Sequence, residues 1–130
     1  MTKDITPPQK PPTLRVTTRP NDANPNGDIF GGWLMSEIDI AGATEATSVA
    51  KDRVATVAVT HLQFINPLFV DDLVSFFTAV DKIGKTSITV NIQVFAQRHR
   101  RSDQAYIPIA EATYVYVAIE KPGVKKALQL

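Results

Sequence analysis

The sequence predicts an α+β fold in which one long antiparallel sheet curls around a single helix. The predicted order along the chain is a strand, a helix and then four strands, with no internal repeat and no second domain. The helix is apolar over much of its circumference, which is typical of a helix buried inside a fold. The strands are long and joined by tight turns, which indicates antiparallel pairing. A helix and a sheet of this kind are expected to bury each other.

The chain begins with a proline-rich stretch and a short strand. Residues 1–12 contain four prolines, so we expect a disordered tail ahead of a single domain over residues 13–130. Residues 13–18 are predicted to form the first strand, which Pro20 ends. A run rich in Asn, Asp and Gly over residues 22–28 predicts a loop.

The periodicity of residues 30–51 predicts the helix. Leu34, Ile38 and Ala41 recur at helical spacing. Other small or apolar residues widen this stripe: Met35, Gly42, Ala46 and Val49. We therefore expect the helix to be enclosed by the fold rather than laid on its surface.

Four strands are predicted after the helix, namely residues 54–64, 73–83, 86–98 and 107–120. Apolar and polar residues alternate most clearly in the third of them. Gly84 and Lys85 predict a tight turn before it, and a polar loop over residues 99–104 follows it. Pro122 and Gly123 are expected to end the last strand.

The composition excludes several classes of protein. With 44% apolar residues and a net charge of +1, the chain has neither the polarity of a disordered protein nor the charge of a typical nucleic-acid binder. Its lack of cysteine excludes disulfides, thiolate nucleophiles and cysteine-bound zinc. No apolar run approaches the roughly 20 residues of a membrane span, and no signal peptide is apparent. We therefore expect a soluble, cytoplasmic protein with no membrane or nucleic-acid partner.

The most informative stretch of the chain runs from Asn24 to Asp39. Gly31 and Gly32 weaken the start of a helix, but they let another molecule approach its backbone closely. The first N–H groups of a helix lack intrahelical partners and carry partial positive charge, which suits a developing oxyanion. The alternative is that both glycines serve tight packing of the helix start against the sheet.

Asp39 is an unusual residue for the middle of an apolar helix. Aspartate is a poor helix former and is rarely buried without a partner. Gly42 and Ala43 follow it at helical spacing, which leaves room for a ligand or a partner chain beside the carboxylate. From the residues alone, Asp39 is either a catalytic carboxylate or an acceptor of hydrogen bonds from nearby backbone.

Four segments together resemble the hotdog-fold acyl-CoA thioesterases, and their bacterial YciA-type branch in particular. They are residues 24–39, with the run Asn-Gly-Asp-Ile-Phe-Gly-Gly-Trp, and residues 57–59, 64–67 and 84–87. The resemblance covers roughly residues 14–124. It implies hydrolysis of acyl-CoA to free CoA and a carboxylic acid in fatty acid metabolism. CoA would be part of the substrate, and no separate cofactor is implied.

The resemblance also assigns roles to single residues. Asp39 would act as a general base on water or as a direct nucleophile on the thioester carbonyl. Asn24 would position water or substrate from across a dimer interface. Thr60 stands where close relatives often carry an acidic residue. It would either supply a hydroxyl to substrate or water, or mark a lost acid that alters the rate or the substrate range.

Basic residues at the sheet edges are candidates for holding the three phosphates of CoA. Lys85 and Ser87 match a family segment that lies beside the bound coenzyme. Arg98, with the neighbouring Arg100 and Arg101, is a second candidate. Solvated surface charge is the alternative for each, and we prefer it for the lysines after the last strand.

The two histidines, His61 and His99, form no recognisable catalytic or metal motif, because no serine nucleophile elbow or zinc-protease motif accompanies them. We expect no metal site and place His61 near the interface or the active site. Two other functions stay open. One is a hotdog dehydratase or hydratase, which would usually pair a catalytic histidine with an acid. The other is a non-enzymatic acyl-CoA-binding protein.

The chain is also expected to associate with copies of itself. One helix covers only one side of a long sheet, and exposed strand edges need partners. We therefore expect a two-fold homodimer in which the two sheets join into one. The resemblance implies a homohexamer built as a trimer of such dimers.

Overall fold

The computed structural model describes residues 6–98 and 105–128. The described chain contains one α-helix, one short 3-10 helix and six strands. In chain order these are β1 (Leu14–Thr17), the 3-10 helix (Pro20–Asp22), α1 (Gly31–Ala50), β2 (Val54–Phe64), β3 (Asp72–Ile83), β4 (Ser87–Arg98), β5 (Ile107–Lys121) and β6 (Val124–Lys125).

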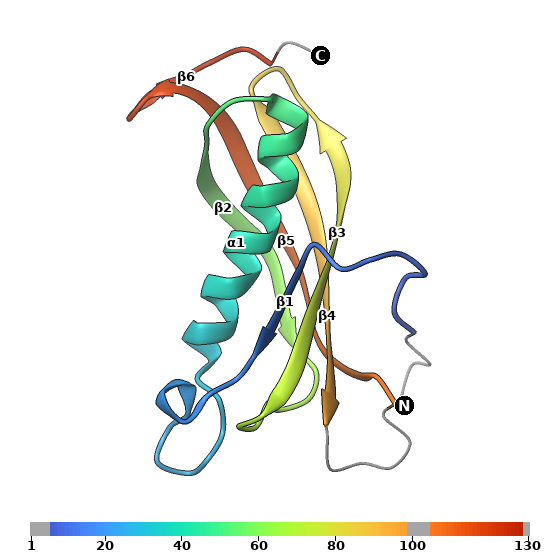
Figure 1. Ribbon diagram of the computed structural model, residues 1–130. Helices are drawn as coiled ribbons and strands as arrows, with labels where there is room; N and C mark the ends of the chain where they lie inside the picture. The colour runs from blue at the N-terminus through green and yellow to red at the C-terminus, as the bar shows by residue number, and fades with distance from the viewer. Residues whose placement is uncertain (1–5, 99–104, 129–130) are drawn as a thin grey trace.

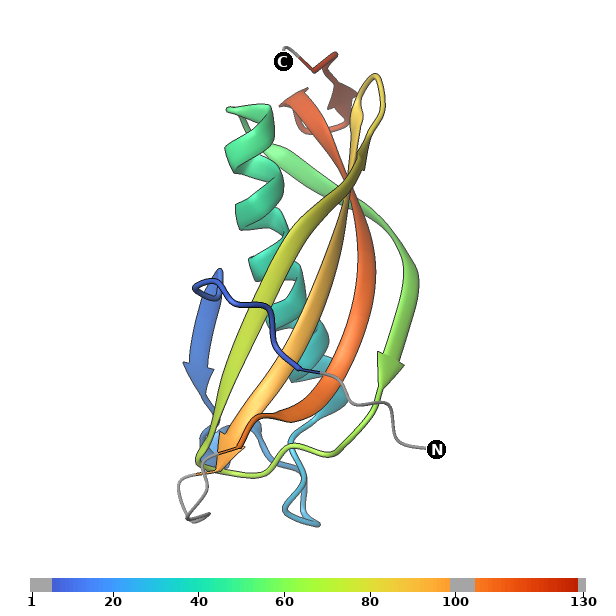
Figure 2. The ribbon, with the colours of Figure 1, turned by 90° about the vertical axis from the view of Figure 1, so that its right-hand side faces the viewer.

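The strands form one antiparallel sheet that curves along the helix. Their order is β1-β3-β4-β5-β2, and β6 pairs with the end of β5. Figure 1 shows α1 lying lengthwise against the sheet, and the turned view in Figure 2 shows the strands bending past it. The core between them includes the fully buried side chains of Ile38, Phe76, Ile92 and Tyr116. The predicted sheet curled around one helix is confirmed.

The two ends of the molecule contain different candidate residues. At one end lie the start of α1, the loop that precedes it and the connection between β2 and β3 (Figure 1). At the other end lie the last turn of α1, the turn between β3 and β4, and the short strand β6 (Figure 1). The helix connects these two ends.

Most predicted elements agree with the observed ones to within one or two residues at each end. The exception is β6, which the sequence did not predict. Pro122 and Gly123 end β5 as expected, but the chain turns back there, with a φ of 82° at Gly123. The Lys126 N–H then donates to the Ala118 carbonyl oxygen at 2.8 Å. The predicted loop over residues 99–104 lies outside the described residues.

In a single chain the helix is buried on one side only. Its buried residues face the sheet and are Leu34, Ile38, Ala41, Gly42 and Ala46. By contrast, Met35 and Ile40 keep 38% and 50% of their surface exposed. The apolar stripe predicted from the sequence is therefore wider than the face that the sheet of the same chain covers. Within the described chain, α1 included, no helix is long and apolar enough to cross a lipid bilayer.

The two edges of the sheet differ in the segments that pair with them. On the β3 side, β1 pairs with Leu73–Phe76, the Thr13 N–H donates to the Phe76 carbonyl, and Lys10 Nζ donates to the Thr78 carbonyl at 2.7 Å. Part of the predicted tail thus lies along the sheet. On the other side, β2 pairs with β5 alone among the described strands. Two register shifts interrupt that pairing, around residues 57 and 60.

Candidate active site

Asp39 lies near the middle of α1, where two side chains from the sheet meet its carboxylate. Thr56 of β2 donates its hydroxyl to Asp39 Oδ1 at 2.7 Å, and the Tyr116 hydroxyl of β5 lies 3.1 Å from the same oxygen. The Tyr116 hydroxyl is also 3.0 Å from the Asp39 backbone carbonyl. Within the described residues no hydrogen bond reaches Oδ2, and Asp39 is partly exposed. One carboxylate oxygen is therefore held by the protein, while the other has no partner among the described residues of this chain.

The room beside Asp39 is filled from within the same chain. A Cβ built on Gly42 would stand 2.2 Å from the Tyr116 hydroxyl oxygen, which is far inside van der Waals contact. The glycine thus accommodates the tyrosine hydroxyl. The sequence-based expectation that this space admits a ligand or a partner chain is wrong at Gly42, because Tyr116 occupies it.

The two tyrosines on the inner face of β5 stay protonated near neutral pH. Burial raises the pKa of Tyr116 far above its ordinary value, and the charge of Asp39 and the hydrogen bond to it raise it further. Burial, followed by the charge of Asp39, also raises the pKa of Tyr114, whose hydroxyl donates to the Met35 carbonyl at 3.2 Å. Both hydroxyls are therefore hydrogen-bond donors to α1.

The two glycines stand at the open start of α1. The first backbone hydrogen bond of the helix runs from the Leu34 N–H to the Phe30 carbonyl at 3.3 Å, so the N–H groups of Gly31 and Gly32 precede it. A Cβ on Gly32 would meet nothing within 4 Å. Gly32 and Asp39 are seven residues apart, which places them on nearly the same face of the helix and about 10 Å apart along its axis.

Asn24 organises the loop that leads into the helix. Its Oδ1 accepts hydrogen bonds from the N–H groups of Asn26 at 2.9 Å and Asp28 at 3.2 Å. Asn24 shares a hollow of about 410 Å³ with Gly31, Phe64 and residues of the β2–β3 connection. Asp39 is not among the lining residues. Within one chain, Asn24 and Gly31 therefore lie together, and Asp39 lies apart from them.

Thr60 is not the threonine that contacts Asp39. It lies at the second register shift of β2, is exposed, and has its hydroxyl 3.4 Å from the Thr113 carbonyl. Thr56 lies four residues earlier on the same strand and carries the hydroxyl beside Asp39. The sequence reasoning missed both Thr56 and Tyr116. The signal for Tyr116 is that it falls on the same face of an alternating strand as Tyr114.

The proposed CoA-binding residues lie at opposite ends of the sheet. Lys85 lies in the turn between β3 and β4, and Ser87 is the first residue of β4; the Gly84 N–H donates to the Ser87 carbonyl at 2.8 Å. The Lys85 side chain is exposed, and the turn between β3 and β4 lies at the same end of the molecule as the last turn of α1 (Figure 1). Arg98 ends β4, eleven residues after Ser87, which is about 36 Å at the rise of a strand. The two sites are too far apart within one chain to hold the same phosphate group.

Arg98 already has partners within the chain. Its Nε lies 3.2 Å from Oδ1 of the buried Asp72, and its Nη2 donates to the Pro67 carbonyl at 2.7 Å. The guanidinium carbon also lies 4.7 Å from the centre of the Phe69 ring. These contacts fasten the end of β4 to the β2–β3 connection. Arg100 and Arg101, the other members of this predicted group, lie outside the described residues.

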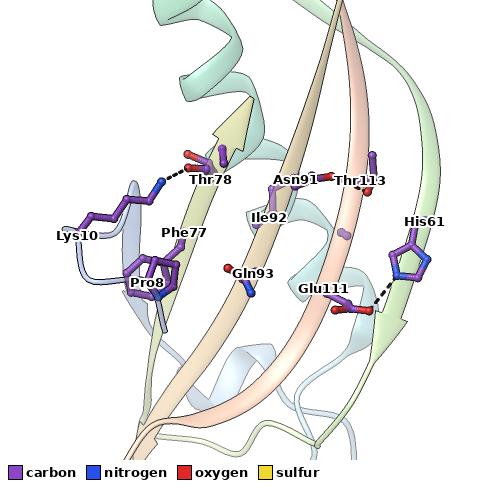
Figure 3. A pocket seen from close by; sticks show the side chains of 12 residues that line it. Pro8, Lys10, His61, Phe77, Thr78, Asn91, Ile92, Gln93, Glu111 and Thr113 are labelled. Atoms are coloured by element: carbon purple, nitrogen blue, oxygen red, sulfur yellow. Dashed lines mark hydrogen bonds and ion pairs between the residues drawn. The ribbon is translucent and has the colours of Figure 1, made fainter. Parts of the chain in front are cut away.

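A second hollow, of about 390 Å³, lies on the face of the sheet turned away from α1 (Figure 3). His61 lies 3.3 Å from Glu111 there, and Thr113 donates to the side chain of Asn91 at 2.9 Å. His61 is therefore separated from Asp39 by the sheet. Among the described residues no cluster of His, Asp or Glu is suited to hold a metal ion.

Comparison with known proteins identifies the family. The family model described as Thioesterase superfamily matches residues 26–102, which is more than half of the chain. The chain belongs to the thioesterase superfamily. The acyl-CoA thioester hydrolase YciA of Salmonella typhimurium is 42% identical over 123 residues, which cover 93% of this chain and 92% of the relative. The predicted YciA-type family is therefore confirmed.

Solved thioesterase structures share the fold. A hexameric thioesterase from Yersinia pestis superposes with a TM-score of 0.87 at 38% identity, covering 96% of this chain and all of the other. A hexameric hotdog fold thioesterase of Campylobacter jejuni gives 0.85 at 36% identity, covering 92% and 91% of the two chains. The predicted hotdog fold is confirmed, with α1 as its central helix.

Proposed function

We propose that this thioesterase hydrolyses acyl-CoA, releasing free CoA and a carboxylic acid. The proposal rests on the hydrogen bonding of the Asp39 carboxylate. Its Oδ1 is held by Thr56 and Tyr116, and Oδ2 has no partner among the described residues. A carboxylate fixed at one oxygen and available at the other suits a general base or a nucleophile. The YciA relatives, named as acyl-CoA thioester hydrolases, support this substrate class.

The start of α1 is proposed to stabilise the oxyanion. Attack on a thioester carbonyl places negative charge on its oxygen, and N–H groups at a helix start favour such a charge. The open space over Gly32 would let the substrate carbonyl approach the backbone. Gly31 and Gly32 are therefore assigned to the oxyanion and Asp39 to the attacking side of the carbonyl.

The active site is proposed to form between two chains. A two-fold pairing of the open edges of β2 inverts the strand, so the Phe64 end of one copy lies toward the Val54 end of the other. Gly31 and Asn24 belong to the Phe64 end of a chain, because they share a hollow with Phe64. Pairing would therefore bring Asn24 and the helix start of one copy toward Asp39 of its partner.

Exposed apolar side chains along the proposed seam support this pairing. Val57, Val59 and Phe64 of β2 keep 51%, 44% and 51% of their surface exposed, which is typical of a surface that a partner covers. The solved relatives are described as hexamers. We propose a homohexamer that is assembled as a trimer of these dimers.

Lys85 and Ser87 are proposed to hold phosphates of CoA. Ser87 lies level with Val117 and, through β5, with the start of β2, so this turn is at the Val54 end of the sheet. The same pairing brings the partner's helix start toward that end. The contacts of Arg98 with Asp72 and Pro67 favour a structural role for that residue.

The test of the function is thiol release from a panel of acyl-CoA substrates, with Asp39→Asn as the matched control. Hydrolysis by the wild type and its loss in Asp39→Asn are expected. Binding of acyl-CoA without thiol release would instead indicate a binding protein. Conversion of an enoyl-CoA without thiol release would indicate a hydratase, although the described His61 stands on the opposite face of the sheet from Asp39.

A further inference from the structure

Tyr116 reaches from the sheet into the middle of the helix. Its side chain is fully buried, and its hydroxyl meets two oxygens of one residue, the carbonyl and Oδ1 of Asp39. A buried hydroxyl requires a hydrogen-bond partner, because leaving it unsatisfied costs about 1–3 kcal/mol. Here the partner is the residue assigned to catalysis.

The approach of Tyr116 depends on Gly42. A Cβ at that position would stand 2.2 Å from the hydroxyl oxygen and 2.9 Å from the ring carbon Cζ. A glycine in the middle of a helix costs roughly 0.5–1 kcal/mol relative to alanine. Its φ lies outside the left-handed region, so backbone conformation does not require it. A glycine is needed there because the Tyr116 side chain occupies the space that a Cβ would fill.

Burial also decides what kind of role Tyr116 has. The side chain has no solvent-exposed surface in the single chain, and Gly42 covers the hydroxyl from the helix side. The phenol therefore cannot donate its proton to a substrate directly, and it acts through Asp39.

We propose that Tyr116 is a positioning residue for Asp39, seated in the gap left by Gly42, which holds Oδ1 so that Oδ2 is the oxygen presented to water or thioester. The role of Asp39 in thioester hydrolysis is the proposed function on which this inference rests. Thr56 holds the same Oδ1 from β2, so the carboxylate is oriented from two strands. Fixing a reacting group in this way lowers the activation barrier through orientation.

Tyr116→Phe tests the role, with Tyr114→Phe as the matched control. Both variants remove one buried hydroxyl from the same face of β5, but the Tyr114 hydroxyl donates to the Met35 carbonyl and not to Asp39. We expect kcat to fall roughly tenfold in Tyr116→Phe, below the roughly 100-fold cost of a fully misplaced group. KM should change less than about twofold, because the variant leaves unchanged the contacts that bind the substrate and the transition state equally well. Tyr114→Phe should keep its kcat while losing a similar amount of thermal stability.

Gly42→Ala supplies an independent test. The added methyl should displace the Tyr116 hydroxyl and lower kcat about as much as Tyr116→Phe does. The two changes together should lower kcat little further, because both remove one contact. Fully multiplicative losses in the double variant would overturn the proposal, as would equal kcat values in Tyr116→Phe and Tyr114→Phe.

Crystal structures of the wild type and Tyr116→Phe separate this inference from the function itself. Absence of thiol release by the wild type from every acyl-CoA would defeat the proposed function alone. The positioning role would then still be tested by the rotamer of the Asp39 side chain in the two crystal structures. A new or second rotamer of Asp39 in Tyr116→Phe supports it, and an unchanged single rotamer overturns it.

Discussion

The ring of Phe64 lies beside Gly31, with its Cζ and Cε2 atoms 3.5 Å and 3.6 Å from the point where a Cβ on Gly31 would stand. The last residue of the edge strand β2 therefore touches the first residue of α1. Any partner that pairs with β2 changes the surroundings of the helix start. This contact links the oligomeric state to the N–H groups that are assigned to the oxyanion.

Gly32→Ala is expected to make the protein more stable and less active. The added methyl meets nothing in the fold, and alanine in a helix is favoured over glycine by roughly 0.5–1 kcal/mol, so the melting temperature should rise slightly. The same methyl narrows access to the backbone, so kcat should fall at least about tenfold if a donor worth roughly 3–4 kcal/mol is obstructed. Calorimetry and thiol release measure the two effects. A more stable variant with unchanged kcat would remove Gly32 from the oxyanion site.

Asp39→Asn should abolish most of the activity without disturbing the fold. The amide oxygen can still accept from Thr56 and Tyr116, so the melting temperature should change little. Loss of charge and basicity should lower kcat roughly 100-fold or more. Saturating acyl-CoA isolates kcat in this measurement. A lower melting temperature with most of the activity retained would show a structural acceptor instead.

Lys85→Ala should weaken substrate binding, whereas Arg98→Ala should lower the stability of the fold. Removing the exposed Lys85 charge should raise KM for acyl-CoA roughly tenfold, as expected for one charged hydrogen bond to phosphate, with kcat and melting temperature unchanged. Arg98→Ala leaves the buried Asp72 without its cation and should lower stability by about 1–3 kcal/mol. Lys121→Ala, on the exposed end of β5, is the control for loss of a surface charge. An unchanged KM in Lys85→Ala would place the phosphates elsewhere.

Val59→Lys should separate the proposed dimer into single chains. It puts a charge on the open edge of β2, and two-fold pairing would repeat that charge on the partner nearby. Light scattering at micromolar concentration should show a smaller species than the wild type, with thiol release lost because the site is shared. Val124→Lys makes the same change on β6, also at an exposed valine, and should leave the assembly intact. A wild-type monomer would defeat the shared site altogether.

Stability should fall when the pH rises above about 10, the ordinary pKa of an exposed tyrosine. Burial and Asp39 raise the folded-state pKa of Tyr116, and burial followed by Asp39 raises that of Tyr114. Above the unfolded-state pKa, the unfolded chain loses these protons while the folded chain keeps them, so proton release favours unfolding. Urea unfolding between pH 8 and about 11 should show the decline. The double variant Tyr114→Phe, Tyr116→Phe should flatten it, and an equally steep decline there would assign the effect to other groups.

The sequence is sufficient to predict the fold because its signals are local. Helical spacing from Leu34 to Ala41 and alternation along β4 identify elements without knowledge of their neighbours. The contacts of Asp39 are different, because they depend on the register of β2 and β5. The regular pairing at the start of β2 places Thr56 opposite Tyr116, and two register shifts separate Thr56 from Thr60. No rule of sequence spacing predicts such shifts.

Charge patterns were less informative than apolar periodicity. Arg98 and Lys85 look alike in the sequence, since each is a basic residue at the end of a strand. Only the fold separates them, because Asp72 and the Pro67 carbonyl lie within reach of Arg98 while the Lys85 side chain is exposed. The short strand β6 was missed for a related reason. Its two residues carry too little pattern, and their pairing follows from the turn at Gly123.

The Lys10 contact with the Thr78 carbonyl has a consequence for how large the assembled sheet can grow. The segment from Lys10 to β1 occupies the β3 side of the sheet, while the β2 side is open. If two copies join through β2, the combined sheet has β1 at both of its outer edges. A third copy would then meet the short strand β1, which pairs with only Leu73–Phe76 of β3 and offers little strand to extend, so the proposed pairing disfavours growth into fibres along the hydrogen-bonding direction. We therefore expect a larger assembly to use the faces of these paired sheets.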